Sequence, residues 1–186
     1  SLRESHKKKV EGLSLEEKTS QSDQLVAELL KFMPLTSAEA ILFFNPLPDE
    51  PQIQFLIQKF LDEGKTLYFP KVEGESLSLH TIASKEDFIV GAFGILEPNT
   101  PAIENPSIDI ALIPGMVFSK NCQRIGRGKG FYDRYLSKTS ENLIKCGICF
   151  ENQVVDDYIP QDLHDISMDV VLTPKQTIIH PQGKLA

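Results

Sequence analysis

A short basic and glycine-rich segment, residues 124–133, contains the side chains whose types and spacing best fit a chemical role. It reads Arg-Ile-Gly-Arg-Gly-Lys-Gly-Phe-Tyr-Asp. Glycines let the backbone approach a ligand closely, and successive N–H groups in such a loop form a concave anion site. Guanidinium and ammonium groups suit the oxygens of a triphosphate. The predicted phosphate site comprises Gly126, Gly128 and Gly130 with the cations Arg124, Arg127 and Lys129.

Asp133 ends this segment, and a carboxylate beside phosphates is well placed to hold Mg2+, which prefers oxygen ligands. The segment contains neither G-x-x-x-x-G-K-[ST] nor the glycine spacing of the dinucleotide fingerprint. The alternative interpretation is a solvated basic turn that binds nothing. Three glycines, three cations and an aromatic pair in ten residues make that alternative the weaker one. The residues predict phosphate binding, but they do not define the reaction.

Strands and helices must alternate to position this segment. Strand 109–113, a loop, the glycine turn and a helix over 131–138 follow one another, which places Gly126 to Asp133 at the carboxyl end of a strand. Open α/β sheets bind ligands there. We therefore expect an α/β fold, with three αβα layers around an open, mostly parallel, Rossmann-like sheet. Other buried strands are expected at 40–44, 66–69, 146–150 and 170–173, with a half-exposed strand around Leu77 and Leu79.

Two further helices are predicted before the glycine-rich segment. Ser14 and Glu17 form a capping box for a helix that Pro34 ends. Pro51 suits the first turn of the next helix, and Gly64 lies where its carboxyl-terminal cap belongs.

Composition restricts the class of protein. The chain has 186 residues, enough for one large core and too few for two comfortable domains, so we expect a single domain over 1–186. The net charge of -7 disfavours a general nucleic-acid binder, and no apolar run approaches the roughly 20 residues that span a bilayer. Three cysteines are an odd count that fits a reducing cytoplasm. Cys146 and Cys149 have C-x-x-C spacing, but their apolar surroundings indicate a buried strand rather than a metal or redox site.

Residues 113–118, 124–133 and 135–136 together resemble the signature of the 5-formyltetrahydrofolate cyclo-ligase family. Further matching fragments, in the same order, extend the resemblance over nearly the whole chain. They are Leu2-Arg3, Leu13-Ser14, Glu16 to Ser22, Asp49-Glu50, Gly64-Lys65, Gly94 to Pro98, and Asp165 with Asp169 to Thr173.

The resemblance implies an enzyme that uses ATP to close 5-formyltetrahydrofolate to 5,10-methenyltetrahydrofolate, releasing ADP and phosphate. A formamide oxygen is a poor leaving group, and its phosphorylation creates an imidate-type phosphate that N10 of the folate can attack. A protein accelerates such a transfer mainly by positioning and by stabilising charge. The resemblance also implies Mg2+, small-molecule partners alone, a cytoplasmic location and a monomer.

The resemblance carries roles over to individual residues. Arg127, Lys129 and Tyr132 would be catalytic, and Asp133 and Asp165 would hold the metal. ATP would bind Arg3, Arg124, Gly126, Arg127, Gly128, Lys129, Gly130, Phe131 and Tyr132. The folate would bind Asn45, Glu50, Phe93, Arg127 and Tyr132, with the carboxylate of Glu50 on the pterin N–H groups and the ring of Phe93 stacked on the substrate.

Some of these residues have simpler interpretations. An acid such as Glu50 is favoured in the first turn of any helix by the helix dipole, Asp165 fits a polar turn, and Phe93 fits a core. The chain also departs from the family pattern, because Phe131 replaces a usual Tyr and Ser119 a usual Asp. The family's Lys, four positions before the residue that matches Arg3, falls outside this sequence.

Two other functions are compatible with the pattern. A sugar-phosphate isomerase or acyl-CoA transferase can use a similar open sheet, since fold alone does not determine function. Leu2-Arg3 and Glu50 have no role in those enzymes, which disfavours them. The second alternative is a module that senses nucleotide or folate without turnover, favoured by Phe131 and by the Lys outside the sequence. Consumption of ATP on addition of 5-formyltetrahydrofolate distinguishes these possibilities.

Overall fold

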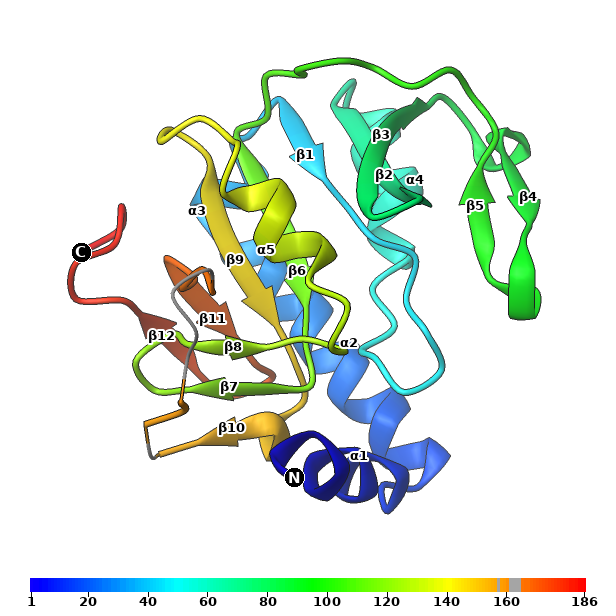
Figure 1. Cartoon of the computed structure of the whole chain (residues 1–186). Helices are drawn as coiled ribbons and strands as arrows, with labels where there is room; N and C mark the ends of the chain where they lie inside the picture. Colours follow the sequence, from blue (N-terminus) through cyan, green and yellow to red (C-terminus); the bar gives the residue numbers. More distant parts are fainter. Residues whose placement is uncertain (157, 161–164) are drawn as a thin grey trace.

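The structure is a computed structural model that describes residues 1–156, 158–160 and 165–186, apart from the side chain of Phe93. In these residues the central feature is a seven-stranded sheet with the order β12-β11-β9-β6-β1-β2-β3 (Figure 1). Neighbours from β11 to β2 pair in parallel, whereas the edge strands β3 and β12 pair antiparallel. The strands are β1 Ala40–Leu42, β2 Thr66–Glu73, β3 Ser76–Ile82, β6 Ile110–Pro114, β9 Ile144–Ile148, β11 Val170–Leu172 and β12 Thr177–Ile179.

Helices cover both faces of this sheet, as predicted for an αβα arrangement. On β6, Ile110 and Leu112 belong to one buried cluster and Ala111 and Ile113 to the other, because successive strand residues point to opposite faces. The first cluster includes side chains of α2 and α4, and the second includes Leu136 of α5. The helices are α1 Leu2–Glu11, α2 Leu15–Lys31, α3 Met33–Thr36, α4 Phe55–Asp62 and α5 Phe131–Leu136.

Two small sheets lie outside the central one, and neither was predicted. The sheet β10-β7-β8 pairs Val117–Ser119 (β7) with Arg124–Ile125 (β8) and Val154–Val155 (β10). The sheet β4-β5 is a hairpin of Phe88–Val90 and Leu96–Pro98, which projects from the body in Figure 1. Short 3-10 helices are formed by η1 Lys85–Asp87, η2 Ala92–Gly94 and η3 Glu151–Gln153.

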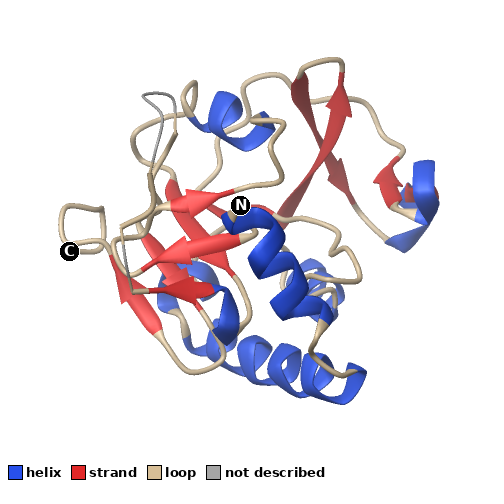
Figure 2. Cartoon of the chain, turned by 60° about the horizontal axis from the view of Figure 1, so that its bottom comes forward, coloured by secondary structure: helices blue, strands red, loops and turns tan. Residues whose placement is uncertain are grey.

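The first helix packs against η3 and β7, far along the chain (Figure 2). The side-chain amide of Asn152 donates to the carbonyl of Lys9 at 3.1 Å, across 143 positions. Among the described residues, no helix combines the length and the apolar character needed to cross a membrane. Cys122, Cys146 and Cys149 are buried and carry free thiols.

Local signals in the sequence account for the helix ends. The hydroxyl of Ser14 accepts from the backbone N–H of Glu17 at 3.0 Å, and the Glu17 carboxylate accepts from the N–H of Ser14 at 3.2 Å. This confirms the predicted capping box. Gly64 follows α4 with a φ of +81°, which confirms the predicted glycine cap.

The sequence predicts that a helix begins around Pro51 and that the strand 66–69 ends at Pro70, and both predictions are wrong. Helix α4 begins at Phe55 rather than at Pro51, because Gln52 is held outside it: its N–H donates to the Ser22 hydroxyl at 2.9 Å and its amide to two carbonyls. Strand β2 continues through Pro70. The backbone N–H and C=O groups of alternate strand residues point to the same side, so those of Tyr68 and position 70 both face β1. The Tyr68 carbonyl accepts from the N–H of Phe43, just past the end of β1. The ring nitrogen of Pro70 therefore faces a side where β1 has ended and offers no partner that a proline N–H would have to bond.

Candidate active site

The glycine loop connects β8 to α5 at the carboxyl end of β6, where the sequence predicted it (Figure 1). The N–H of Met116, just past β6, donates to the carbonyl of Ile125 at 2.8 Å and fixes the start of the loop. Gly128 has a φ of +101° and Gly130, the N-cap of α5, a φ of +69°. Residues that carry a side chain rarely adopt such positive φ angles, so both positions favour glycine for conformational reasons.

Arg124 lies beneath the loop rather than on its surface. It is 7% exposed, and its Nε donates to the carbonyl of Pro114 at 2.7 Å. Its guanidinium lies over the ring of Tyr132, 5.1 Å from the ring centroid. A Cβ on Gly126 would be 2.9 Å from the Arg124 Nη2, so the guanidinium also packs under the loop backbone. Arg124 therefore supports the loop from inside.

Burial shifts the pKa of both stacked groups. Burial lowers the pKa of Arg124, while the charge of Asp133 opposes that shift. Burial also raises the pKa of Tyr132 well above its ordinary value. A phenol is protonated at neutral pH with its ordinary pKa, and the upward shift preserves this state at higher pH, so Tyr132 is suited to donate a hydrogen bond.

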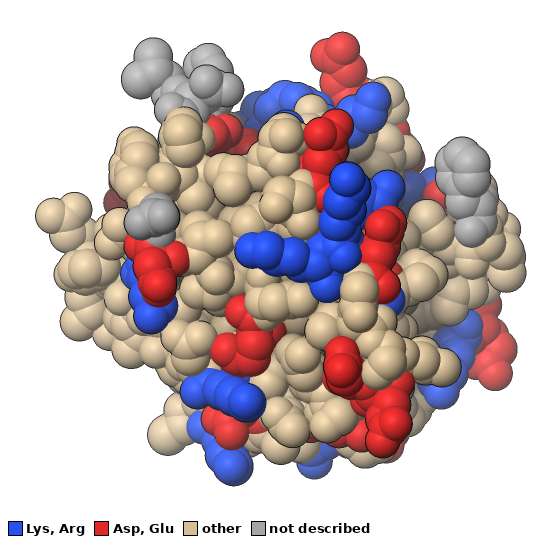
Figure 3. Space-filling view, turned by 90° about the horizontal axis from the view of Figure 1, so that it is seen from below, with Lys and Arg blue, Asp and Glu red and all other residues tan. Residues whose placement is uncertain are grey.

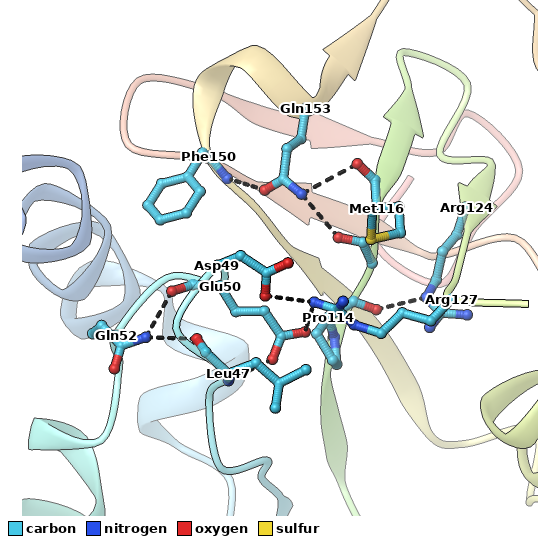
Figure 4. A network of polar contacts seen from close by, with 11 residues as sticks. Leu47, Asp49, Glu50, Gln52, Pro114, Met116, Arg124, Arg127, Phe150 and Gln153 are labelled. Carbon is cyan, nitrogen blue, oxygen red and sulfur yellow. Dashed lines mark hydrogen bonds and ion pairs between the residues drawn. The ribbon is translucent and has the colours of Figure 1, made fainter. Parts of the chain in front are cut away.

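Arg127 joins the glycine loop to the segment that follows β1 (Figure 4). Its Nη2 lies 2.8 Å from Oδ1 of Asp49 and 3.4 Å from Oε2 of Glu50. Glu50 is 5% exposed, and its other oxygen accepts from the N–H of Leu47 at 2.8 Å. Burial raises the pKa of Glu50, whereas the Leu47 hydrogen bond and the charge of Arg127 act in the opposite direction. A buried carboxylate and a cation of the glycine loop thus lie in direct contact.

Asp133 and Asp165, the predicted metal ligands, act on each other electrostatically. Burial raises the pKa of Asp133, and the negative charge of Asp165 contributes in the same direction. Oδ1 of Asp133 accepts from the N–H of Ile166 at 3.1 Å, which orients the carboxylate. The part of the chain that the structure describes contains no group of three or more His, Cys, Asp or Glu side chains suited to a metal. Two carboxylates fit Mg2+ all the same, because this ion usually combines one or two carboxylates with phosphates and water.

Helix α1 brings a further predicted residue to the loop. Nε of Arg3 donates to the carbonyl of Gly126 at 2.8 Å, and its guanidinium carbon lies 3.7 Å from the place of a Cβ on Gly128. Lys129 is exposed on the same loop. The face seen from below, where α1 lies, shows Lys and Arg side chains gathered near its centre with Asp and Glu side chains around them (Figure 3). Arg3 and Lys129 therefore accompany Arg127 around the loop.

Asn45 and Phe131 contact segments other than the loop centre. The amide of Asn45 donates to the carbonyl of Leu96 at 3.1 Å and so holds the β4-β5 hairpin. Phe93 belongs to that hairpin region, but its side chain lies outside the described residues. The ring of Phe131 packs under Arg134, whose Nε and Nη2 both donate to the carbonyl of Glu75 in the β2-β3 turn.

Sequence reasoning did not assign a role to Asp49, Arg134 or Gln153. Gln153 donates to the carbonyls of Gly115 and Met116 at 3.0 and 3.2 Å and thereby fixes the turn after β6 (Figure 4). Nothing in the local pattern marks Gln153 or Arg134. Asp49 stands beside Glu50 in the sequence, but nothing in the pattern marks Arg127, 78 positions away, as its partner.

Comparison with known proteins identifies the family. The model of the 5-formyltetrahydrofolate cyclo-ligase family matches residues 1–174. The chain belongs to this family. Membership confirms the resemblance seen in residues 113–136 and makes the chain a ligase of folate and one-carbon metabolism. The isomerase and transferase alternatives are therefore set aside.

Individual cyclo-ligases match over most of their length. The 5-formyltetrahydrofolate cyclo-ligase of Mus musculus is 26% identical over 185 residues, which cover 92% of this chain and 91% of that protein. A probable 5-formyltetrahydrofolate cyclo-ligase of Schizosaccharomyces pombe is 29% identical over 153 residues, covering 74% and 75%. The NMR structure of Aquifex aeolicus 5,10-methenyltetrahydrofolate synthetase aligns with a TM-score of 0.86 at 31% identity, over 98% of this chain and 93% of that one.

Proposed function

We propose that this chain closes 5-formyltetrahydrofolate to 5,10-methenyltetrahydrofolate at the expense of ATP, with release of ADP and phosphate. The contact between Arg127 and Glu50 carries this proposal, beside membership of the family. A phosphate loop alone fits many ATP-using proteins. Here a cation of that loop lies against a buried carboxylate, which is the group that suits paired ring N–H donors of a pterin. The arrangement would bring a nucleotide and a heteroaromatic substrate to one place.

ATP would lie on the glycine loop, where backbone N–H groups, Lys129 and Arg3 face its phosphates. Arg124 would act as a positioning residue, because it is buried and holds the loop through Pro114 and Tyr132. Asp133 and Asp165 would hold Mg2+, which when bound would neutralise charge on the phosphate oxygens. Burial is the main cause of the raised pKa of Asp133, and the smaller contribution from the charge of Asp165 supports this role, since two neighbouring carboxylates are suited to share a cation.

The reaction would proceed in two steps. The formyl oxygen attacks the γ-phosphorus, the bond to ADP breaks, and an imidate-type phosphate forms on the folate. N10 then attacks the formyl carbon and loses its proton, and the carbon–oxygen bond breaks to release phosphate. Arg127 and Lys129 would stabilise the charge on the phosphoryl group during transfer. The protonated phenol of Tyr132 would donate a hydrogen bond, and Glu50 would orient the pterin.

We also propose a cytoplasmic monomer with small molecules as its only partners. Three buried free thiols support a reducing compartment, and a net charge of -7 disfavours nucleic acid. Light scattering of the purified chain tests the monomer, and a stable dimer would contradict it.

Absorbance near the methenyl-folate band tests the function. Protein, Mg2+, ATP and 5-formyltetrahydrofolate should give a rise that is absent without ATP. Arg127→Ala and Asp133→Asn should each lower kcat/KM at least about 100-fold, whereas Glu63→Gln, which removes a solvent-exposed ion pair on α4, should not. Binding of both substrates without turnover would favour the sensing module instead. Full activity in both variants would reject the residue assignment.

A further inference from the structure

Asp49 has no part in the reaction proposed above, yet it makes the shorter ion pair of Arg127. The distance from Arg127 Nη2 is 2.8 Å to Asp49 and 3.4 Å to Glu50. The Asp49 side chain is 24% exposed and that of Glu50 only 6%. Asp49 lies on the segment after β1 and Arg127 on the glycine loop, 78 positions apart. Asp49 therefore determines where the guanidinium rests, at the boundary between the phosphate loop and Glu50 (Figure 4).

In this resting arrangement Glu50 is already occupied on both sides. Leu47 donates to Oε1 at 2.8 Å, and Arg127 contacts Oε2 at 3.4 Å. A carboxylate that receives two ring N–H groups of a pterin presents both oxygens to them, as in other two-point recognition. Each carboxylate oxygen can accept more than one hydrogen bond, so Oε1 can keep the Leu47 bond, whereas the guanidinium of Arg127 on Oε2 competes with the folate for Glu50.

A triphosphate would compete for Arg127 in turn. The side chain of Arg127 is 40% exposed and belongs to the loop that also carries Lys129. Its guanidinium can therefore turn toward phosphates bound at that loop. Phosphate oxygens are anionic like those of the two carboxylates and accept from the fork of an arginine in the same way. When Arg127 leaves, Glu50 is a buried carboxylate without its cation, which is costly until new donors arrive. The N–H groups of the pterin are such donors.

We propose that Asp49 is a positioning residue that holds Arg127 on Glu50 until nucleotide binds, and thereby makes folate affinity depend on ATP. This inference rests on the proposed function, because it takes Glu50 as the pterin contact and the glycine loop as the nucleotide site. Linkage requires the effect to be reciprocal, so folate must raise nucleotide affinity by the same factor.

The test measures binding in the absence of turnover. The Kd of 5-formyltetrahydrofolate is determined by calorimetry with Mg2+, with and without the β,γ-imido analogue of ATP. In the unaltered chain the analogue should tighten folate binding about tenfold, within the usual range of coupling between sites. Asp49→Asn should bind folate more tightly without nucleotide, and the coupling should fall to about twofold. Glu63→Gln, which loses an exposed ion pair on α4, should keep the full coupling.

Further comparisons make each outcome decisive. Asp49→Glu keeps the charge and should restore the coupling, whereas loss of packing alone would not be rescued in this way. Equal folate affinity with and without the analogue in the unaltered chain, or full coupling in Asp49→Asn, would overturn the inference. A chain that forms methenyl-folate but shows no coupling rejects this inference alone. A chain that forms none rejects the proposed function itself.

Discussion

The guanidinium of Arg124 stacks on the ring of Tyr132, with 5.1 Å between the guanidinium carbon and the ring centroid. The two residues come from β8 and α5, on opposite sides of the glycine loop. The same guanidinium donates to Pro114 at the end of β6. A single planar cation thus ties the strand, the loop and the helix together, and lysine cannot reproduce both contacts at once.

Arg124→Lys should lower both the stability of the protein and its affinity for ATP. Loss of the buried Pro114 hydrogen bond and of the stacking should lower the free energy of unfolding by about 1 to 3 kcal/mol. Urea denaturation measures this, and the KM for ATP should rise in the same variant. Arg134→Lys is the matched control, because Arg134 also donates to a carbonyl and packs over an aromatic ring but is solvent-exposed. Equal losses in the two variants would contradict a special role for the buried site.

Gly128→Ala should affect nucleotide binding more than folding. The positive φ of +101° makes any side chain strained, and the loop backbone must shift to relieve the strain. Gly64→Ala introduces comparable strain after α4, at φ +81° with open space around it. We expect both variants to lose about 1 to 2 kcal/mol of stability, and only Gly128→Ala to raise the KM for ATP, by about tenfold. An unchanged KM would show that the loop backbone does not contact the phosphates.

Asp133→Asn should raise stability at neutral pH while it removes activity. Burial raises the pKa of Asp133, so the folded protein holds this proton more tightly than the unfolded chain does. Stability from this group is therefore present below the unfolded pKa of about 4 and lost as pH rises through the raised folded pKa. Without Mg2+ and nucleotide, the variant should have the higher Tm at pH 7.5 and no advantage at pH 3.5. A lower Tm at pH 7.5 would show that the charge is stabilised where it lies.

Arg3→Ala should weaken ATP binding and leave the fold intact. Arg3 is exposed, and its hydrogen bond to the Gly126 carbonyl holds α1 on the loop. We expect a KM for ATP raised about tenfold with little change in Tm, because surface contacts contribute little to stability. Lys8→Ala, an exposed cation on the same helix, is the control for general loss of positive charge. If both variants raise the KM equally, the effect is long-range attraction rather than a contact of Arg3.

The parts of the fold that depend on local chemistry could be predicted from the sequence. The capping box of Ser14 and the glycine cap at Gly64 are made by neighbouring residues, so the pattern contains all that forms them. The apolar run of β6 also predicts burial on both faces. The predictions from Pro51 and Pro70 failed because distant partners decide those positions: Ser22 holds Gln52 outside the helix, and the end of β1 makes room for Pro70 in β2.

In the candidate site, too, the residues that are adjacent in sequence could be predicted, whereas the contacts between distant residues could not. The glycines and cations of 124–130 are adjacent in sequence, and the structure has a loop there with two positive φ angles, whereas phosphate binding by that loop stays a prediction. Asp49 meets Arg127 across 78 positions and Arg3 meets Gly126 across 123. Spacing along the chain contains no information on such pairs. The short strands β7 and β8, which aim Arg124 inward, are too brief to give a periodic signal.

Helix α1 has a consequence for the order in which the site is made. The ribosome releases α1 well before Gly126 and Asn152, which anchor it through Arg3 and Lys9 and are synthesised more than a hundred codons later. A nascent chain therefore exposes the helix with nothing to dock on until most of the protein has emerged. Contacts between such distant residues also slow folding, because the chain loses the entropy of loop closure before the contacts begin to stabilise it. The proposed nucleotide site would therefore form only after Gly126 and Asn152 have been made, and we expect a chain cut before them not to hold ATP.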